Sequence, residues 1–327
     1  MKAAYYDRQG PAREVLQVGN LPDPAPGPGE VLVRVEMSGV NPSDVKGRQG
    51  GRAPMAHPRI VPHSDASGTI VAVGDGVSPA RIGEHCWTYN VQWERAFGTA
   101  AELVVLSADR AVPLPQGMDF ASGACLGIPA MTAHRAVFAD GPVTDKWVLV
   151  TGGAGSVGHY AIQFAKWGGA KVITTVSGDA KAAHARQAGA DVVLNYRTDD
   201  VVACVLELTD GKGVDRIVDV EFGGNIDVTQ KVIRLNGTIA SYASAAVREP
   251  AIPFYVFMYK NVTLRTVLVY NMPEEAKAAA IRDIARAQGD GALKHAIGAT
   301  FSLDEIAAAH EAVEQGTMIG NVVVQVR

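Results

Sequence analysis

Three closely spaced glycines point most directly to a chemistry in this chain of 327 residues. Gly153, Gly155 and Gly158 have the spacing G-x-G-x-x-G and follow a strand-like run at 147–151. In such a loop Gly153 permits the tight turn, Gly155 lets a pyrophosphate approach the backbone, and Gly158 lets the next helix pack against the sheet. We therefore predict dinucleotide binding, with a purely structural turn as the alternative.

The residues after this loop have the apolar spacing of a helix. Val157, Ala161 and Phe164 fall on one face of it. The backbone amides of Ser156 and Val157 would face the same anion, because the first amides of a helix have no partner within it. The segment is not a nucleophile elbow, since G-x-S-x-G around Ser156 would need glycine where Ala154 stands.

The residues after the next strand-like run indicate which dinucleotide to expect. NAD-binding units place a carboxylate about 20 residues into the motif, where it accepts hydrogen bonds from the ribose. Here that position falls around Ser177, where no carboxylate would repel a 2′-phosphate, and the nearby Asp179 is expected to cap a helix. Lys181 and Tyr196 could donate to that phosphate, although Lys181 could also be an ordinary solvated lysine. We predict NADPH rather than NADH.

The elements that must position these residues follow from the pattern of apolar runs. From about residue 120, strand-like runs begin at 148, 172, 192, 217 and 238, spaced as one strand, one helix and two loops. Such continuous apolar runs are typical of parallel strands buried on both faces. A further strand is expected at 263–269, and helices at 179–189, from about Asp199 with Thr198 as cap, at 274–288 and at 303–314. We predict an α/β fold with a Rossmann doubly wound parallel sheet over 121–290.

The first third of the chain has a different texture. Strand-like runs at 31–35, 69–73 and 102–106 are separated by turns rich in glycine and proline. Such short, irregularly spaced strands favour a partly open β-barrel. A last strand at 322–326 is expected to return to this barrel, which makes its domain discontinuous, with residues 1–120 and 291–327.

Composition and charge exclude several classes of protein. Hydrophobic residues make up 47% and charged residues 20%, which is typical of a globular chain. The net charge of −4 gives no electrostatic reason to expect a nucleic acid or an anionic membrane as partner. The three cysteines, Cys86, Cys125 and Cys204, are too few and too separated for a disulfide scaffold. With no signal peptide or membrane span evident, a cytoplasmic protein is expected.

Several motifs together resemble the medium-chain dehydrogenase/reductase superfamily, and within it the zinc-free quinone oxidoreductases related to ζ-crystallin. The motifs cover essentially the whole chain and comprise GVNPSD at 39–44, VPHSDASG at 61–68, GIPAMTA at 127–133, the glycine loop, AGA at 188–190, NYR at 195–197 and IGNVV at 319–323. The resemblance implies a GroES-like barrel joined to a Rossmann domain, with NADPH and substrate in the cleft between them. It also implies a homodimer as the usual assembly.

The resemblance further assigns roles to single residues. Asn41 and Thr132 would lie beside the nicotinamide. Asp44 would help to hold the catalytic loop, although it could equally be a helix-capping carboxylate. Pro129 and Asn321, which lie in two of the matching motifs, would contact the cofactor.

The zinc ligands of the related alcohol dehydrogenases are missing from the matching positions. Asn41 stands in the region of the first catalytic cysteine, and Ser64 and Asp65 replace the His-Glu pair. The structural zinc lobe would need four clustered cysteines, and Cys86 stands alone there. His57, His63, Asp65 and Cys86 are residue types that could bind a metal, but they do not have the ligand spacing of the family. We predict no metal.

Without zinc there is no Lewis acid to stabilise an alkoxide, so a quinone or an activated enone is a better hydride acceptor than an alcohol's ketone. We predict zinc-independent, NADPH-dependent reduction of quinones. The alternatives are reduction of 2-enoyl or alkenal substrates and a non-catalytic NADPH-binding protein. His63 and Ser64 are the proton-donor candidates in their loop, and solvent could suffice for a quinone.

The acceptor pocket is the least defined part of the sequence. Tyr89, Trp93 and Phe97 could stack on a flat acceptor or could equally pack in the core. The relatives often carry a tyrosine just after the aspartate, whereas this chain has Lys46 in that region and Arg52 in a following stretch that also lacks an aromatic residue. This departure leaves substrate stacking open.

Overall fold

The computed structural model describes residues 1–51 and 53–327. Arg52, one of the two basic residues noted where the relatives carry aromatic residues, lies outside the described residues. The rest divides by its contacts into two compact units, Met1–Pro129 with His295–Arg327, and Ala130–Lys294. We call the first the barrel unit and the second the parallel-sheet unit.

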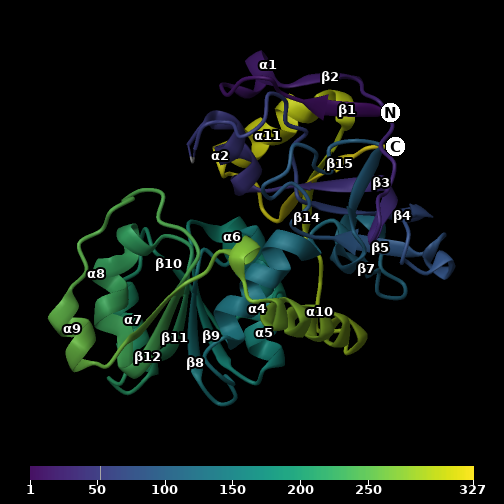
Figure 1. The fold of residues 1–327 in the computed structure, drawn as a ribbon. Coiled ribbons are helices and arrows are strands. Elements are labelled where there is room, and N and C mark those ends of the chain that lie inside the picture. Colours follow the sequence, from purple (N-terminus) through teal and green to yellow (C-terminus); the bar gives the residue numbers. More distant parts are fainter. Residues whose placement is uncertain (52) are drawn as a thin grey trace. The chain divides into compact units, whose positions relative to one another are not determined.

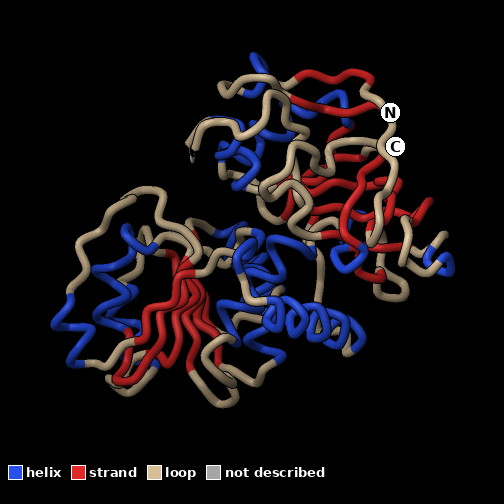
Figure 2. The backbone as a smooth tube through the Cα atoms, in the orientation of Figure 1, coloured by secondary structure: helices blue, strands red, loops and turns tan. Residues whose placement is uncertain are grey.

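The parallel-sheet unit is built around one twisted layer of strands, shown in red in Figure 2. In spatial order the strands are β10 (Val192–Asn195), β9 (Lys171–Val176), β8 (Trp147–Thr151), β11 (Val214–Asp219), β12 (Ile233–Ser241) and β13 (Thr263–Thr266). Every neighbouring pair is parallel. The chain winds outward from β8 to β10 and then returns to place β11 on the other side of β8. Ligands of doubly wound sheets bind where the winding reverses, here at the carboxyl ends of β8 and β11.

Helices cover both faces of this sheet (Figure 1). One face carries α7 (Val201–Leu208) and α8 (Phe222–Val232), and the other carries α4 (Met131–Phe138), α5 (Ser156–Trp167) and α10 (Glu274–Gly289). The shorter helices of the unit include α6 (Asp179–Gln187), α9 (Phe254–Tyr259) and the 3₁₀ turn Val269–Asn271. Because both faces are covered, Leu149, Ile173 and Ile217 are fully buried, which explains the continuous apolar runs in the sequence.

Two expected element boundaries in this unit are wrong. The helix predicted from Asp199 begins at Val201, and its cap is Asp200, whose carboxylate accepts a hydrogen bond from the Ala203 amide at 3.0 Å. Thr198 instead bonds within the preceding turn, because Asp199 is used there to accept from the Asn195 amide at 2.8 Å. The strand predicted at 263–269 ends at Thr266, since the chain turns into the 3₁₀ segment that follows.

The barrel unit is organised around the long strand β3 (Glu30–Val40). One side of β3 pairs antiparallel with β4 (Asp65–Val73). On its other side β6 (Leu103–Ser107) pairs with the first half and β15 (Asn321–Gln325) with the second half. The chain end therefore returns to the centre of the N-terminal sheet, which is why this unit is discontinuous in sequence.

The remaining elements of the barrel unit are short. Its other strands are β1 (Lys2–Tyr5), β2 (Gln17–Asn20), β5 (His85–Thr88), β7 (Ala111–Pro113) and β14 (Ile297–Ser302), and its helical segments are α1 (Ala12–Val15), α2 (Pro42–Gln49), α3 (Phe120–Gly123), α11 (Ile306–Gln315) and the 3₁₀ turns Pro79–Arg81, Ala108–Arg110 and Leu303–Glu305. A π-helical segment, Leu126–Ala130, ends the first part of the unit. Within the described residues, no helix of either unit is long and apolar enough to span a bilayer.

Candidate cofactor and substrate site

The glycine loop leaves the carboxyl end of β8 as a tight turn. The residue with the left-handed conformation is Gly152, with φ of +67°, so the turn lies one position before Gly153, to which the sequence assigned it. Gly153 is required for another reason: a Cβ there would lie 2.1 Å from Oγ1 of Thr174 on the neighbouring strand β9. Glycine at 153 therefore lets the loop pack against the sheet.

Gly155 and Gly158 differ in the room around them. A Cβ at Gly158 would lie 2.3 Å from the carbonyl oxygen of Gly152, so only glycine lets α5 start this close to the loop. A Cβ at Gly155 would meet nothing nearer than 3.4 Å. Gly155 is the N-cap of α5, directly before Ser156 and Val157, whose amides belong to the first turn of that helix. No side chain at position 155 therefore stands beside the backbone N–H groups of Ser156 and Val157. Such N–H groups at the start of a helix are the donors that a bound anion requires.

A pocket of about 630 Å³ lies beside this loop, at the same edge of the sheet. The ends of three strands and two helices line it, through Leu149, Thr151, Gly152, Thr175, Val201, Val202, Val220 and Val228 among others. Apolar side chains from α7 and α8 face its interior, and such a lining suits a flat ring. Tyr196 is also a lining residue and is 55% exposed.

The two other predicted phosphate ligands lie at the start of α6. Ser177 and Lys181 are both half-buried and stand on either side of Gly178, the N-cap of that helix. Arg197, which sequence reasoning did not select, is exposed directly after Tyr196. Its place beside a selected residue at the end of a strand was the available signal.

Three carboxylates also line the pocket beside Tyr196, and each accepts a backbone hydrogen bond. Asp199 accepts from the Asn195 amide at 2.8 Å, and Asp200 caps α7. Glu221 caps α8 and also accepts from the amides of Ala245 and Ala246, at 2.7 and 3.1 Å. These carboxylates therefore hold the loops around the pocket, while their charge disfavours an anion on that side.

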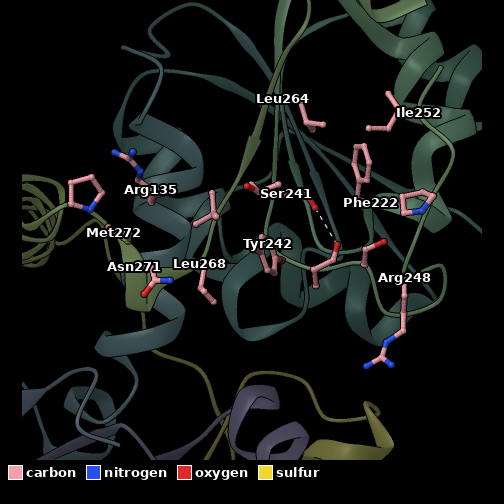
Figure 3. A pocket seen from close by; sticks show the side chains of 16 residues that line it. Arg135, Phe222, Ser241, Tyr242, Arg248, Ile252, Leu264, Leu268, Asn271 and Met272 are labelled. Atoms are coloured by element: carbon pink, nitrogen blue, oxygen red, sulfur yellow. Dashed lines mark hydrogen bonds between the residues drawn. The ribbon is translucent and has the colours of Figure 1, made fainter. Parts of the chain in front are cut away.

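A second pocket, of about 690 Å³, lies at the same carboxyl edge, beyond β12 and β13. Phe222, Ile252 and Leu264 form an apolar group at one side of it in Figure 3, and Arg135 and Asn271 stand at the other. All of the strands are parallel, so their carboxyl ends share one edge and the glycine loop stands in line with both pockets. This edge can accommodate an elongated ligand with a flat group at each end and an anionic centre.

Asp219 connects the loop to this edge, and sequence reasoning missed it. Its Oδ1 accepts from Thr151 Oγ1 at 2.7 Å, from Asn225 Nδ2 at 2.8 Å and from the Glu221 amide at 3.1 Å. The side chain is fully buried, and burial raises its pKa above the ordinary value despite those donors. The available signal was an aspartate at the carboxyl end of a predicted strand, next to the switch in strand order.

In the barrel unit, Asn41 and Asp44 lie at the start of α2. The backbone N–H of Asn41 donates to Asp44 Oδ2 at 2.8 Å, so Asp44 does act as a capping carboxylate. The side-chain Nδ2 of Asn41 donates to Asp65 Oδ2 at 2.9 Å. Asp65 also accepts from the Ile128 amide at 2.8 Å. Asp65 therefore joins α2, β4 and the π-helical segment, a role that sequence reasoning missed.

Hydrogen bonds compensate the charge of the Asp65 carboxylate only in part. It is fully buried, and its Oδ1 has no hydrogen-bond partner among the described residues. Burial raises the pKa of Asp65 well above its ordinary value, and the amides of Ile128 and Asn41 oppose that rise only in part. A Cβ at Gly127 would lie 2.1 Å from Oδ1, so this glycine lets the π-helical segment close over the carboxyl group.

The remaining predicted residues are distributed over both units. Ser64 is buried immediately before β4, and Pro129 is buried within the π-helical segment. Thr132, in the first turn of α4, is only 5% exposed. Asn321 begins β15, and its Nδ2 donates to the Ala296 carbonyl oxygen at 3.1 Å. His63 has both ring nitrogens engaged by protein groups, which makes it unsuitable as a direct proton donor.

The three candidate aromatics do not share one environment. Tyr89 is buried, with its ring centroid 5.9 Å from that of Trp87, while Trp93 is half-buried. Phe97 is 48% exposed and lines a different pocket, of about 430 Å³, together with Met1 and other N-terminal residues. Of the two predicted roles, stacking on an acceptor and packing in the core, the burial of Tyr89 favours packing in the core.

The described part of the chain contains no group of three or more His, Cys, Asp or Glu side chains that could hold a metal ion. Cys86 is fully buried on β5, and burial raises its pKa to about 12, so it is a poor thiolate ligand. His63 and Asp65 are each committed to protein hydrogen bonds. The four residues considered as possible metal ligands in the sequence, His57, His63, Asp65 and Cys86, thus do not form a metal-binding group in the described part of the chain.

The amino-acid sequence and the fold of this chain are similar to those of known proteins. Residues 27–116 match the alcohol dehydrogenase GroES-like domain, and residues 156–286 match the zinc-binding dehydrogenase family. A quinone oxidoreductase of Rattus norvegicus is 29% identical over 91% of this chain and 89% of its own length. The crystal structure of an NAD-dependent alcohol dehydrogenase is 30% identical, with a TM-score of 0.90 and full coverage of both chains. The chain belongs to the medium-chain dehydrogenase/reductase superfamily, in its quinone oxidoreductase family.

This membership confirms the predicted fold class, a GroES-like barrel with a Rossmann domain, and the prediction of an oxidoreductase. A mycobacterial relative whose structure was solved in complex with NADPH is 28% identical, with a TM-score of 0.89 over the whole of both chains. A 2-haloacrylate reductase of a Burkholderia species is 28% identical over 99% of this chain and 98% of its own length. The relatives of this chain therefore include both quinone oxidoreductases and a 2-haloacrylate reductase.

Proposed function

We propose that this chain is an NADPH-dependent reductase that delivers a hydride to quinones without a metal ion. The observation that carries this proposal is the glycine loop at the switch in strand order, with two pockets along the same sheet edge, one of which the loop itself lines. NADPH, when bound, supplies the hydride, and the protein binds and orients it and excludes water.

The loop fits a pyrophosphate by its shape and its donors. Gly155, the N-cap of α5, carries no side chain beside the first amides of that helix. Gly153 and Gly158 let the loop lie against β9 and against its own turn. We assign Gly153, Gly155, Ser156, Val157 and Gly158 to the pyrophosphate, in agreement with the dipole at the start of a helix.

The preference for NADPH depends on the edge near α6. No carboxylate stands at 176–178, and Ser177, Lys181 and Tyr196 can donate to a 2′-phosphate. The carboxylates beside Tyr196 oppose an anion there, but their oxygens already accept backbone hydrogen bonds. One relative is solved with NADPH and another is described as NAD-dependent, so direct titration with both cofactors is the decisive measurement.

Zinc independence is supported by the side chains at the relevant positions. Asn41 and Ser64 carry an amide and a hydroxyl, which are weak zinc ligands compared with thiolate and imidazole. Asp65 is committed to Asn41 and Ile128. Metal analysis of the purified protein tests this part: stoichiometric zinc that is needed for turnover would overturn it.

The residues we assign to the hydride transfer are Asn41, Asp44, Ser64 and Thr132, with Pro129 and Asn321 as further cofactor contacts. Asn41 and Asp44 are fixed by their bonds at the start of α2, and Asp65 orients the Asn41 amide. An amide held this rigidly can position a nicotinamide or an acceptor oxygen without reorganisation. No proton donor is needed beyond solvent for a quinone, whose conjugation spreads the developing charge.

Oxidation of NADPH with a panel of acceptors tests the substrate class. The panel contains 1,4-benzoquinone, 9,10-phenanthrenequinone, an enone, an enoyl thioester and 2-chloroacrylate. Turnover of the quinones supports the proposal. Turnover of only the activated alkenes would favour the second candidate, which the similarity to the 2-haloacrylate reductase supports. Tight NADPH binding without turnover of any acceptor would favour a non-catalytic role.

We further propose a homodimer formed through β13. This strand is the last in the sheet order, so its outer edge is available to pair with a second copy. Exposed apolar residues lie on this strand and next to it in the sequence: Leu264 on β13, Leu268 after it, and Phe254, Tyr255 and Tyr259 on the preceding helix α9. Light scattering after size exclusion should give twice the mass of the chain, and Leu264→Lys should shift it toward the monomer. A monomeric wild-type protein would contradict this assembly.

A further inference from the structure

A continuous run of buried polar side chains crosses the barrel unit behind the Ser64–Asp65 turn. His310 Nε2 lies 3.0 Å from His63 Nε2, and His63 Nδ1 lies 2.9 Å from Ser38 Oγ. Ser38 Oγ lies 2.8 Å from Thr99 Oγ1, which donates to the Asp65 carbonyl oxygen at 2.8 Å. All five residues are fully buried. The run connects α11, at the end of the chain, with the residue that holds Asn41.

The direction of each hydrogen bond in this run follows from its fixed end. A carbonyl oxygen can only accept, so the single hydroxyl proton of Thr99 points to Asp65. Ser38 must then donate to Thr99, and its own proton is used, so His63 must donate from Nδ1. A neutral His63 then accepts at Nε2, which makes His310 the donor from its Nε2.

The end of the run at His310 agrees with this assignment. His310 Nδ1 is buried without a hydrogen-bond partner among the described residues, as expected for the unprotonated nitrogen of a neutral imidazole. An imidazolium at either position would leave a buried proton with no acceptor or would set two donors against each other. The charged groups nearby also disfavour an imidazolium. The Arg48 guanidinium on α2 opposes a positive charge on His310, and Glu314 on α11 is already paired with Arg48.

The backbone of His63 lies in a region that is uncommon for residues with a side chain. Its φ is +75°, a left-handed conformation that histidine, asparagine and aspartate adopt more often than other such residues, at some cost in energy. Its carbonyl oxygen accepts from the Thr99 amide at 3.0 Å, and Gly98 allows that close approach. The bond to His310 therefore holds a turn whose next residues are Ser64 and Asp65.

We propose that His310 is a positioning residue, which fixes His63 and thereby the place of Asp65 and the orientation of the Asn41 amide. The proposal rests on the proposed function only in that Asn41 is assigned to the hydride transfer. His310 touches none of the groups assigned to the reaction, so it acts through His63. The hydrogen-bond run and the orientation of Asn41 can be observed without turnover.

The test compares two variants of His310 with the wild-type protein. His310→Gln retains an N–H donor at similar reach, whereas His310→Phe fills the space and removes the donor. We expect His310→Phe to lower kcat by about tenfold, the effect of one lost buried hydrogen bond. The Kd of NADPH should change less than kcat, because the glycine loop assigned to the pyrophosphate lies in the other unit. His310→Gln should restore most of kcat.

Nuclear magnetic resonance of protein with ¹⁵N-labelled histidine and asparagine gives the readout that does not depend on activity. At pH 7 we expect His63 as the Nδ1–H tautomer and His310 as the Nε2–H tautomer, both neutral. The Asn41 side-chain amide signal should move in His310→Phe and remain in place in His310→Gln. A cationic imidazole, the opposite tautomers, or an unmoved Asn41 signal in His310→Phe would overturn the proposal. Equal kcat in both variants and wild type would overturn it too, whereas a wild-type protein with no turnover but the expected signals would contradict only the proposed function.

Discussion

The buried histidine pair makes the barrel unit sensitive to acid, and the size of this effect can be calculated. Burial lowers the pKa of His63 to about 3 and lowers that of His310 well below its ordinary value. In the unfolded chain both titrate near 6.5. The neutral forms are therefore favoured by folding, so their contribution is complete above pH 6.5 and is lost as the pH falls toward the folded-state values. Between pH 7.5 and 5.0 the protonation of His63 should cost about 2 kcal/mol of stability, and His310 adds a loss of the same sign.

Hydrogen exchange of the amides of β3 and β4 measures this loss within the barrel unit. The comparison protein is the double variant His63→Asn/His310→Phe, in which asparagine tolerates the left-handed backbone and phenylalanine fills the space of the imidazole. The drop in stability from pH 7.5 to 5.0 should be smaller in the variant by at least about 2 kcal/mol, or roughly thirtyfold in protection, which is the contribution of His63 alone. Other groups, including His295, whose pKa burial lowers to about 4, titrate in both proteins and cancel. An equal drop in the two proteins would show that the pair is not buried in neutral form.

Three further outcomes are expected. Gly158→Ala should weaken NADPH binding at least about a hundredfold, because its Cβ would lie 2.3 Å from the Gly152 carbonyl oxygen, whereas Gly289→Ala, with nothing within 4 Å, serves as the matched control in the same calorimetric titration. Replacing Lys181 by Ala should cost about tenfold in affinity for NADPH and leave NADH within about twofold; equal losses would mean that the 2′-phosphate lies elsewhere. Asp219→Ala should destabilise the parallel-sheet unit by about 2–4 kcal/mol in urea unfolding, since it leaves the buried donor of Thr151 and the half-buried donor of Asn225 without their acceptor. Asp219→Asn retains an accepting oxygen and should cost less.

The parallel-sheet unit was the easier part to predict from the sequence. Its central strands β8, β9 and β11 are buried on both faces, so an uninterrupted apolar run such as 148–151 is required by the fold and visible in the sequence. The glycine loop was visible for a similar reason, because close backbone contacts leave no alternative to glycine at 153 and 158. The turn residue itself was misplaced by one position, since spacing alone does not tell which of two adjacent glycines, Gly152 or Gly153, takes the left-handed conformation.

Short strands of the barrel unit gave no comparable signal. β1, β5 and β7 have three or four residues each, too few for an alternating pattern to emerge. Their pairing is decided by contacts distant in sequence, as when β15 completes β3 across most of the chain. The same limit applies to the site: the capping role of Asp44 is local and could be foreseen, whereas the partners of Asp65 are 24 and 63 positions away.

Asp65 and Asp219, whose roles sequence reasoning missed, are both buried aspartates, and this has a common physical cause. Functional carboxylates are usually expected among other polar residues in a sequence. Asp65 and Asp219 instead stand at the ends of apolar strands, where a single aspartate appears only to interrupt the apolar pattern of the strand. Burial of a carboxyl group is costly unless several donors converge on it, so a buried aspartate fixes the position of every donor that it holds. Asp219 fixes Thr151 and Asn225 beside the glycine loop, and Asp65 fixes Asn41 and the Ile128 amide. An isolated aspartate at the end of an apolar strand is therefore better interpreted as the centre of a rigid site than as a break in a strand.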